Sequence, residues 1–261
     1  MSDIALQRRL DIAIPLAEEA GRMAMRLRPP PGAPAGTLKG AQDWLTEADG
    51  AVEQFLSDEL ARAFPEDGFQ GEETGRGRDG ALRWVVDPID GTSNYARGGG
   101  RFCVSLGLIE ARAALLGVIV APAAGETFAA RLGGGATLNG AAIHAAATTD
   151  LARATVECGW SARLPNPPFW TLVEGIMGQG AMLRAGGSGA LGLADVACGR
   201  TDAYVELHIN LWDVAAALAI LSEAGAVVSP FLEGDGASKG NAIFAAAPGI
   251  AAALQAALPP V

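Results

Sequence analysis

The chain has 261 residues, of which 50% are hydrophobic and 18% charged, a composition typical of a globular protein with a large core and not of a disordered chain. Its formal net charge of -10 argues against a nucleic-acid polymer or an anionic membrane as the main partner, and an anionic substrate would need cations at its site. Three widely spaced cysteines indicate reduced core thiols, and because the sequence has no apolar signal segment or membrane span, we expect a cytoplasmic protein.

The N-terminal half predicts an α+β arrangement. We expect Asp3 to cap a first helix that stops at Pro29, and a second helix to follow Asp49 and end before Pro65. Both helices should pack on one face of a sheet. Its strands are predicted at 69–71, 82–86, 103–109, 113–120 and 126–130, with a polar loop between the first two and a hairpin at Asn139-Gly140. Their close succession favours a largely antiparallel sheet.

From Asp150 onward, strand and helix patterns alternate, which predicts an α/β part. The expected strands are 155–158, 182–184, 203–206, 226–228 and 242–246. The expected helices are 169–177, 189–198, 211–224 and one after Pro248. We therefore expect two domains, an N-terminal one over 1–147 and a C-terminal one over 148–261.

The segment Asp87-Pro88-Ile89-Asp90-Gly91-Thr92 has the layout of a metal-assisted phosphate site. It follows a buried strand, so Asp87 is expected at the strand's end, and Pro88 restricts the backbone between the two carboxylates. Gly91 allows close approach of a ligand, and Thr92 or Ser93 is expected to cap a following helix whose free N–H groups favour phosphate. Two adjacent surface turns, Asp-Pro and Asp-Gly, explain the same residues.

Further acidic residues stand where strands end or helices begin. In α/β proteins ligands bind beyond the carboxyl ends of strands, so these residues can meet in one cleft. A set of carboxylates without His or Cys selects hard cations such as Mg²⁺, and their mutual repulsion is itself an argument for divalent ions. The residues concerned are Asp49, Glu72, Asp87, Asp90 and Asp213.

Four segments together resemble the inositol monophosphatase family in order and spacing, and the resemblance covers nearly the whole chain. They are Thr46-Glu47-Ala48-Asp49, Gly71-Glu72-Glu73, the Asp87 to Thr92 motif and Trp212-Asp213. The resemblance implies a layered αβαβα sandwich, Mg²⁺-dependent and often lithium-sensitive hydrolysis of phosphate monoesters, and a homodimer.

The resemblance also implies the residue roles. Glu72, Asp87 and the carbonyl of Ile89 would hold one Mg²⁺, Asp87, Asp90 and Asp213 a second, and a weaker third ion would lie near Glu72. Thr92, with Asp49 behind it, would orient the attacking water. The backbone N–H groups of Gly91 and Thr92 would bind phosphate. For Asp49 alone, a helix cap is the competing interpretation.

The substrate is less defined. Glu206, with the loop Gly187-Ser188-Gly189 beside it, matches residues that contact substrate hydroxyls in family members. A carboxylate there can accept hydrogen bonds from a polyol or pair with an amine. We expect an inositol 1-phosphate phosphatase, with histidinol phosphate, fructose 1,6-bisphosphate and 3',5'-nucleotide bisphosphates as alternative substrates. His208 is a further candidate for a substrate contact or for orienting Glu206. The alternative that is not an enzyme is a non-catalytic metal-binding or regulatory protein that kept the family fold.

Overall fold

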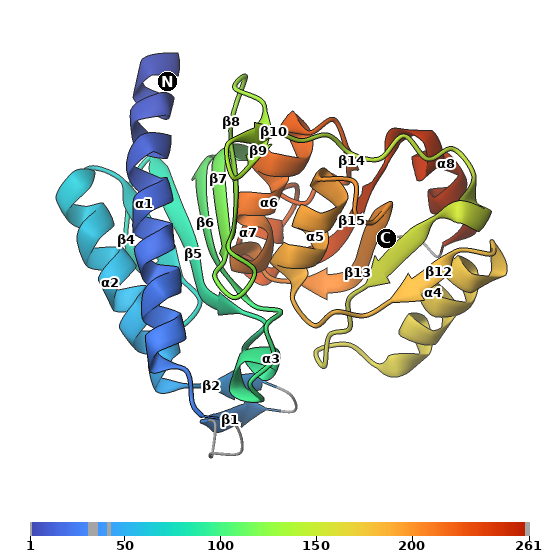
Figure 1. Cartoon of the computed structure of the whole chain (residues 1–261), viewed down its shortest axis with the longest axis horizontal. Coiled ribbons are helices and arrows are strands. Elements are labelled where there is room, and N and C mark those ends of the chain that lie inside the picture. Colours follow the sequence, from blue (N-terminus) through green and yellow to red (C-terminus); the bar gives the residue numbers. More distant parts are fainter. Residues whose placement is uncertain (1, 31–35, 41–42, 259–261) are drawn as a thin grey trace.

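Five layers of helix and sheet make up the chain, as the computed structural model describes it for residues 2–30, 36–40 and 43–258 (Figure 1). Helices α1 (Asp3–Leu27) and α2 (Glu47–Ala63) cover the outer face of an eight-stranded sheet. Helices α5 (Gly189–Ala197) and α6 (Leu211–Glu223) lie between that sheet and a five-stranded sheet, and α4 (Asn166–Gly178) and α8 (Pro248–Ala257) form the last layer. The expected αβαβα sandwich is confirmed.

The eight-stranded sheet is antiparallel except where β3 pairs with β5 in parallel. Its spatial order is β10 (Ala141–Ala142), β9 (Ala136–Leu138), β8 (Glu126–Arg131), β7 (Ala113–Ala121), β6 (Cys103–Glu110), β5 (Leu82–Asp90), β3 (Gly68–Gly71) and β4 (Gly75–Arg78). The predicted hairpin joins β9 to β10, and both turn residues have the positive φ that such a turn requires, 49° at Asn139 and 79° at Gly140.

The five-stranded sheet is mixed. β11 pairs in parallel with β12 and β13, and β15 is antiparallel to both β13 and β14. The order is β12 (Met182–Arg184), β11 (Thr155–Cys158), β13 (Ala203–Ile209), β15 (Asn241–Ala246) and β14 (Val227–Val228). The smaller elements are β1 (Thr37–Gly40), β2 (Asp43–Leu45), α3 (Thr92–Ala96), the 3₁₀ turn η1 (Leu151–Arg153) and α7 (Gly236–Lys239).

Three local predictions were wrong. Ser2, not Asp3, is the N-cap of α1, because the Ser2 hydroxyl accepts the Ala5 N–H and leaves Asp3 in the first turn. The polar segment after β3 contains β4, an edge strand whose glycines and arginines lack the apolar alternation of a buried strand. Strand β5 runs on through Pro88 to Asp90, because the register with β6 is irregular between Asp87 and Asp90, where the missing N–H of proline is tolerated.

Three apolar clusters follow the layers. One lies between α1, α2 and the large sheet, one lies between the small sheet and the α4/α8 layer, and the third fills the space between the two sheets around α5 and α6. The third cluster draws residues from both halves of the sequence, for example Ile119 of β7 and Ile243 of β15. The division at residues 147 and 148 stays a prediction.

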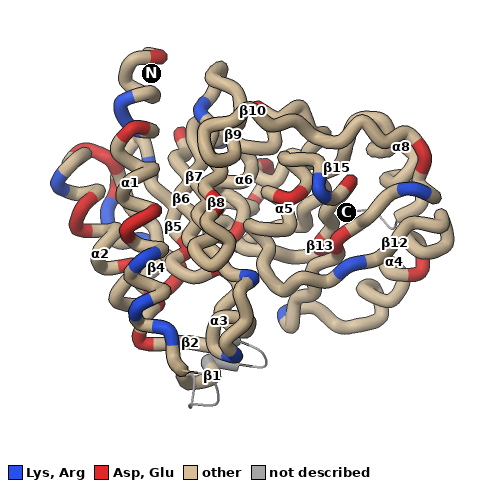
Figure 2. Tube along the Cα trace, in the orientation of Figure 1, with Lys and Arg blue, Asp and Glu red and all other residues tan. Residues whose placement is uncertain are grey.

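Charges on the outer helices are mixed. Figure 2 shows basic and acidic residues interspersed along α1 and α2, and Glu19 pairs with both Arg22 and Arg26. Among the helices that the structure describes, none combines the length and the apolar character that crossing a bilayer requires. All three cysteines carry free thiols, and two of them are buried.

Two glycines let α6 lie directly on the large sheet. Gly107 of β6 and Gly117 of β7 are register partners. A Cβ added at Gly107 would fall 2.6 Å from the Cβ of Ala215, and one at Gly117 would fall 2.0 Å from the carbonyl oxygen of Ala216. Because α6 approaches so closely, its first turn, with Asp213, reaches the end of β5.

The glycine contact yields a stability prediction. Gly117→Ala should lower the free energy of unfolding by about 1–3 kcal/mol, because the added methyl group overlaps the backbone of α6. Urea unfolding followed by circular dichroism measures the change. Gly178→Ala is the matched control, since nothing lies within 4 Å of its added Cβ, and it should be neutral or stabilising by about 0.4–1 kcal/mol. Equal losses for both variants would contradict this account of the packing.

Candidate active site

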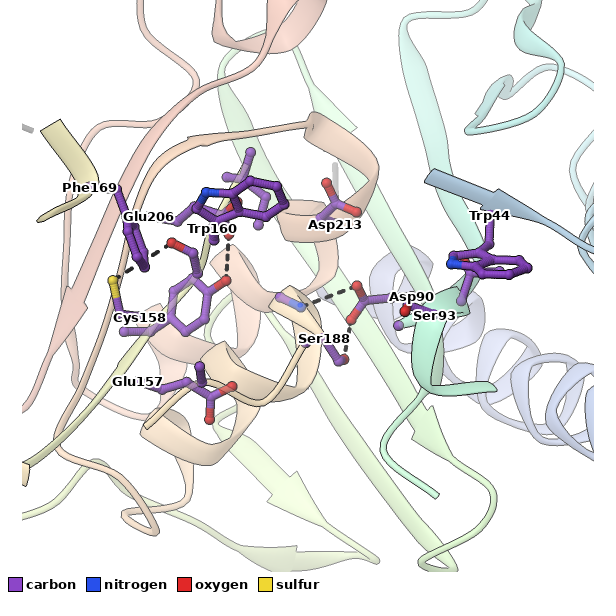
Figure 3. A pocket seen from close by; sticks show the side chains of 18 residues that line it. Trp44, Asp90, Ser93, Glu157, Cys158, Trp160, Phe169, Ser188, Glu206 and Asp213 are labelled. Atoms are coloured by element: carbon purple, nitrogen blue, oxygen red, sulfur yellow. Dashed lines mark hydrogen bonds between the residues drawn. The ribbon is translucent and has the colours of Figure 1, made fainter. Parts of the chain in front are cut away.

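Three carboxylates meet where β5 ends and α6 begins. Asp87 and Asp90 come from β5 and Asp213 from the first turn of α6, and each offers an oxygen within 4.8 Å of the others. Asp87 is 1% exposed and Asp90 6%. Figure 3 shows Asp90 and Asp213 facing the same space. This convergence is the arrangement that the sequence predicts for these three residues.

Backbone contacts fix the direction of two of these side chains. The Ile89 N–H donates to Asp87 Oδ1 at 2.9 Å, which locks the carboxylate back onto its own turn. The Asn210 N–H donates to Asp213 Oδ2 at 3.0 Å, so Asp213 closes a capping box at the start of α6. The helix N-terminus therefore orients a candidate ligand.

Electrostatics make this cluster unfavourable without cations. Burial raises the pKa of Asp87 well above its usual range, and the charges of Glu72, Asp90 and Asp213 raise it further. Burial, followed by the Asp90 charge, raises the pKa of Asp213 to about 7. Because all the donor atoms here are oxygens, the donor set fits a hard divalent cation, which would remove the repulsion.

Asp90 also joins the two halves of the chain. It accepts hydrogen bonds from the Ser188 hydroxyl, from the Gly189 N–H at 3.2 Å and from the Ala190 N–H at 2.9 Å. Ser188 is buried and caps α5 by accepting the Leu191 N–H at 3.3 Å. Its hydroxyl thus links Asp90 to the start of α5, and its contact with substrate stays a prediction.

Glu72 follows β3 and is tied to β5, because its N–H donates to the Val86 carbonyl at 3.1 Å. Its charge is the largest of those that raise the pKa of Asp87. The Glu72 carboxylate therefore acts on the same cluster, from the strand next to β5. Its role as a metal ligand stays a prediction.

Gly91 and Thr92 form the turn after β5. The N-cap of α3 is Gly91, with φ 88°, not Thr92 or Ser93 as predicted, because only a glycine adopts this left-handed conformation without strain. Thr92 is instead the first residue of the helix, and its hydroxyl donates to the Ile89 carbonyl at 2.8 Å. This bond occupies one lone pair of the carbonyl that is a candidate metal ligand.

Asp49 is completely buried in α2. Its Oδ2 accepts the Thr46 N–H at 2.7 Å and the Thr46 hydroxyl at 2.5 Å, which is the capping role that competes with catalysis. Its Oδ1 has no hydrogen-bond partner among the described residues. Burial raises the pKa of Asp49 to about 6. Asp49 therefore combines a structural contact with one free buried acceptor.

A cavity of about 380 Å³ opens beside the carboxylates. Its lining includes Asp90, Gly91, Thr92 and Asp213 as well as Glu206, Tyr204, Trp160 and Phe169. Figure 3 shows Glu206, Trp160 and Phe169 on the side opposite Trp44 and Ser93. Gly187, Ser188 and Trp44 also border it (Figure 3). The predicted phosphate and leaving-group residues thus line one space.

Glu206 is fixed by a tyrosine that the sequence analysis missed. The buried Tyr204 hydroxyl donates to Glu206 Oε2 at 2.6 Å, and a Cβ at Gly159 would lie 2.1 Å from that oxygen. Burial raises the pKa of Glu206 to about 8. The strand alternation of β13 puts both side chains on one face, which is the signal that could have identified Tyr204.

His208 is not among the described residues that border the cavity. Its Nε2 lies 2.9 Å from the Lys239 carbonyl oxygen. The aromatic residues Trp44, Trp160 and Phe169 border the cavity. They were not identified from the sequence, because aromatic side chains are usually structural. The Trp160 indole is oriented by its Nε1–H bond of 2.9 Å to Asn166 Oδ1.

Comparison with known proteins agrees with this geometry. Residues 5–258 match the inositol monophosphatase family. Nus factor SuhB from Xylella fastidiosa is 40% identical over 76% of this chain and 72% of its own length, and an inositol-1-monophosphatase from Rhizobium meliloti is 38% identical over 72% and 73%. The crystal structure of the extragenic suppressor protein suhB from Bartonella henselae superposes with a TM-score of 0.89 at 32% identity, covering 97% of this chain and 99% of that one. The chain therefore belongs to the inositol monophosphatase family and is a phosphoric monoester hydrolase.

Proposed function

We propose that the chain is a Mg²⁺-dependent phosphatase of small polyol or amino-alcohol monophosphates, with inositol 1-phosphate as the leading substrate. The observation that carries the proposal is the cluster of Asp87, Asp90 and Asp213 at the end of a cavity that also holds Glu206. Carboxylates so close together suit two or three divalent ions, and the cavity leaves room for the alcohol beyond them. The names of relatives such as the Rhizobium meliloti inositol-1-monophosphatase support the substrate class.

We assign roles in metal, water and phosphate binding to the residues around the end of β5. Glu72, Asp87 and the Ile89 carbonyl would hold one ion, and Asp87, Asp90 and Asp213 a second. Bound Mg²⁺ supplies positive charge that activates a water and stabilises the leaving oxygen. Thr92 and Asp49 would orient the attacking water, and the N–H groups of Gly91 and Thr92 would bind phosphate oxygens.

Glu206 would recognise the alcohol. It lies at the end of the cavity away from Thr92, and the Tyr204 hydroxyl fixes one of its oxygens, which leaves the other for a hydroxyl or an amine. Histidinol phosphate is therefore the second candidate, ahead of fructose 1,6-bisphosphate and 3',5'-nucleotide bisphosphates. The cytoplasmic location, the homodimer and the lithium sensitivity stay predictions.

The ligand assignment yields a test that separates activity from stability. Asp87→Asn should reduce kcat by at least about 100-fold, because it removes the carboxylate that would bridge two ions. In EDTA the same variant should be at least as stable as the wild type at pH 8, because one of several repelling buried charges is gone. Phosphate release and urea unfolding measure the two effects. A variant that keeps most of its activity would refute the assignment, and the exposed Asp58→Asn is the control that should change neither quantity.

The raised pKa values predict how stability depends on pH. The pKa of Asp49, Asp213 and Glu206 is about 6, 7 and 8 in the folded protein, above the ordinary carboxyl range near 4. Folding therefore favours their protonated forms, and in EDTA the stability should be highest near pH 4–5 and fall as the pH rises to about 8. Mg²⁺ should restore stability at pH 8 much more than at pH 5. Melting temperatures across this range, with and without Mg²⁺, test the expectation, and a Mg²⁺ effect independent of pH would contradict it.

A substrate panel tests the alcohol site. Inositol 1-phosphate should give the highest kcat/KM, ahead of histidinol phosphate, fructose 1,6-bisphosphate and adenosine 3',5'-bisphosphate. At pH 9, where Glu206 is ionised, Glu206→Gln should lower kcat/KM for the preferred substrate by roughly 10–100-fold, because a hydrogen bond to a charged group contributes about 1.5–3 kcal/mol. It should change the hydrolysis of 4-nitrophenyl phosphate, which has no hydroxyls on its leaving group, much less. An equal loss of kcat/KM on both substrates would show that Glu206 does not contact the alcohol part of the substrate.

A further inference from the structure

Glu53 is a buried acid that the proposed mechanism does not use. It lies on the inner side of α2, next to the buried Val52 and one turn after Asp49, and only 1% of its surface is exposed. A carboxylate so buried must be satisfied by hydrogen bonds or by a cation. The partners of Glu53 therefore indicate why a charge stands among apolar residues at this position.

Both oxygens of Glu53 hold one loop. Oε2 accepts the Glu73 N–H at 2.9 Å and Oε1 accepts the Thr74 N–H at 2.9 Å. The residue before them is Glu72, whose own N–H donates to the Val86 carbonyl of β5. Three consecutive N–H groups are thus tied down, one to the strand that carries Asp87 and two to Glu53.

Gly71 supplies independent evidence that the carboxylate belongs at this place. A Cβ added there would lie 2.2 Å from Cδ of Glu53 and 2.3 and 2.5 Å from its oxygens. The Glu53 side chain therefore packs against β3 at a residue without a side chain. Space for the carboxylate exists only because residue 71 is glycine.

We propose that Glu53 is a positioning residue for the metal site. It holds the loop of residues 72–74 and so sets how far the Glu72 carboxylate stands from Asp87. This inference rests on the proposed function, because it takes Glu72 as a metal ligand. A purely structural Glu53 would affect the unfolding free energy and leave the affinity for Mg²⁺ unchanged.

The test is Mg²⁺ binding by Glu53→Gln, measured by isothermal titration calorimetry on the full chain. Glutamine keeps the size of the side chain but puts an amide NH₂ against one of the two N–H donors, so the loop should lose its fixed position. Partners that orient metal ligands typically contribute 10–100-fold to affinity. We expect the Mg²⁺ dissociation constant to rise by roughly that factor, with kcat largely recovered at saturating Mg²⁺.

Glu59→Gln is the matched control. Glu59 lies on the same helix and pairs with Arg62 at the surface, so this variant should bind Mg²⁺ like the wild type. Gly71→Ala provides a second perturbation from the side of the loop, since its methyl group displaces the Glu53 carboxylate, and it decides the question if Glu53→Gln does not fold. The same rise in the dissociation constant is expected.

The outcomes are distinct. Weaker Mg²⁺ binding in Glu53→Gln, with Glu59→Gln unchanged, supports the positioning role. Binding by Glu53→Gln within twofold of the wild type overturns that role and leaves the proposed function standing. If Glu53→Gln does not fold, the same two criteria apply to Gly71→Ala. A wild-type chain that binds no Mg²⁺ would refute the proposed function and this inference together.

Discussion

Repulsion between buried carboxylates is the constraint around which the active site is arranged. Asp87, Asp90 and Asp213 lie within 4.8 Å of one another, and Glu72 adds its charge to Asp87. Without bound cations, such a cluster of like charges does not stabilise the fold. Each side chain is therefore held by a contact to backbone or hydroxyl groups, and those contacts come from a helix N-terminus, a strand end or a neighbouring loop.

Close packing between layers makes these contacts possible. The glycine pair Gly107 and Gly117 lets α6 lie against the large sheet, and the start of α6 then delivers Asp213 to β5. On the other face of the same sheet, α2 packs against β5 and presents Glu53 to the loop after β3. Helices on both faces thus support one group of proposed metal ligands.

Much of this arrangement was predictable from the sequence. The helices, most strands, the layered fold and the convergence of Asp87, Asp90 and Asp213 follow from apolar periodicity, the Asp-Pro-Ile-Asp-Gly-Thr motif and a family resemblance. The N-cap of α1 and the strand β4 were not predictable. Ser2 and Asp3 are equally good helix caps, and β4 has no alternation of apolar residues. Glu53 was missed because its partners lie in a loop distant in sequence. Tyr204 could have been identified, because it stands two residues before Glu206 and therefore on the same face of the strand.

The hydrogen bonds between Asp90 and the start of α5 join two halves of the chain that contribute different residues to the cavity. Most of the residues proposed for the reaction come from the large sheet and α2, whereas Tyr204, Glu206, Trp160 and Phe169, at the far end of the cavity, all come from the C-terminal half. Asp90 is one of the points at which the two meet. On the proposed assignment, substrate preference can therefore diverge through changes in the C-terminal half that leave Asp87 and Asp90 of the large sheet untouched.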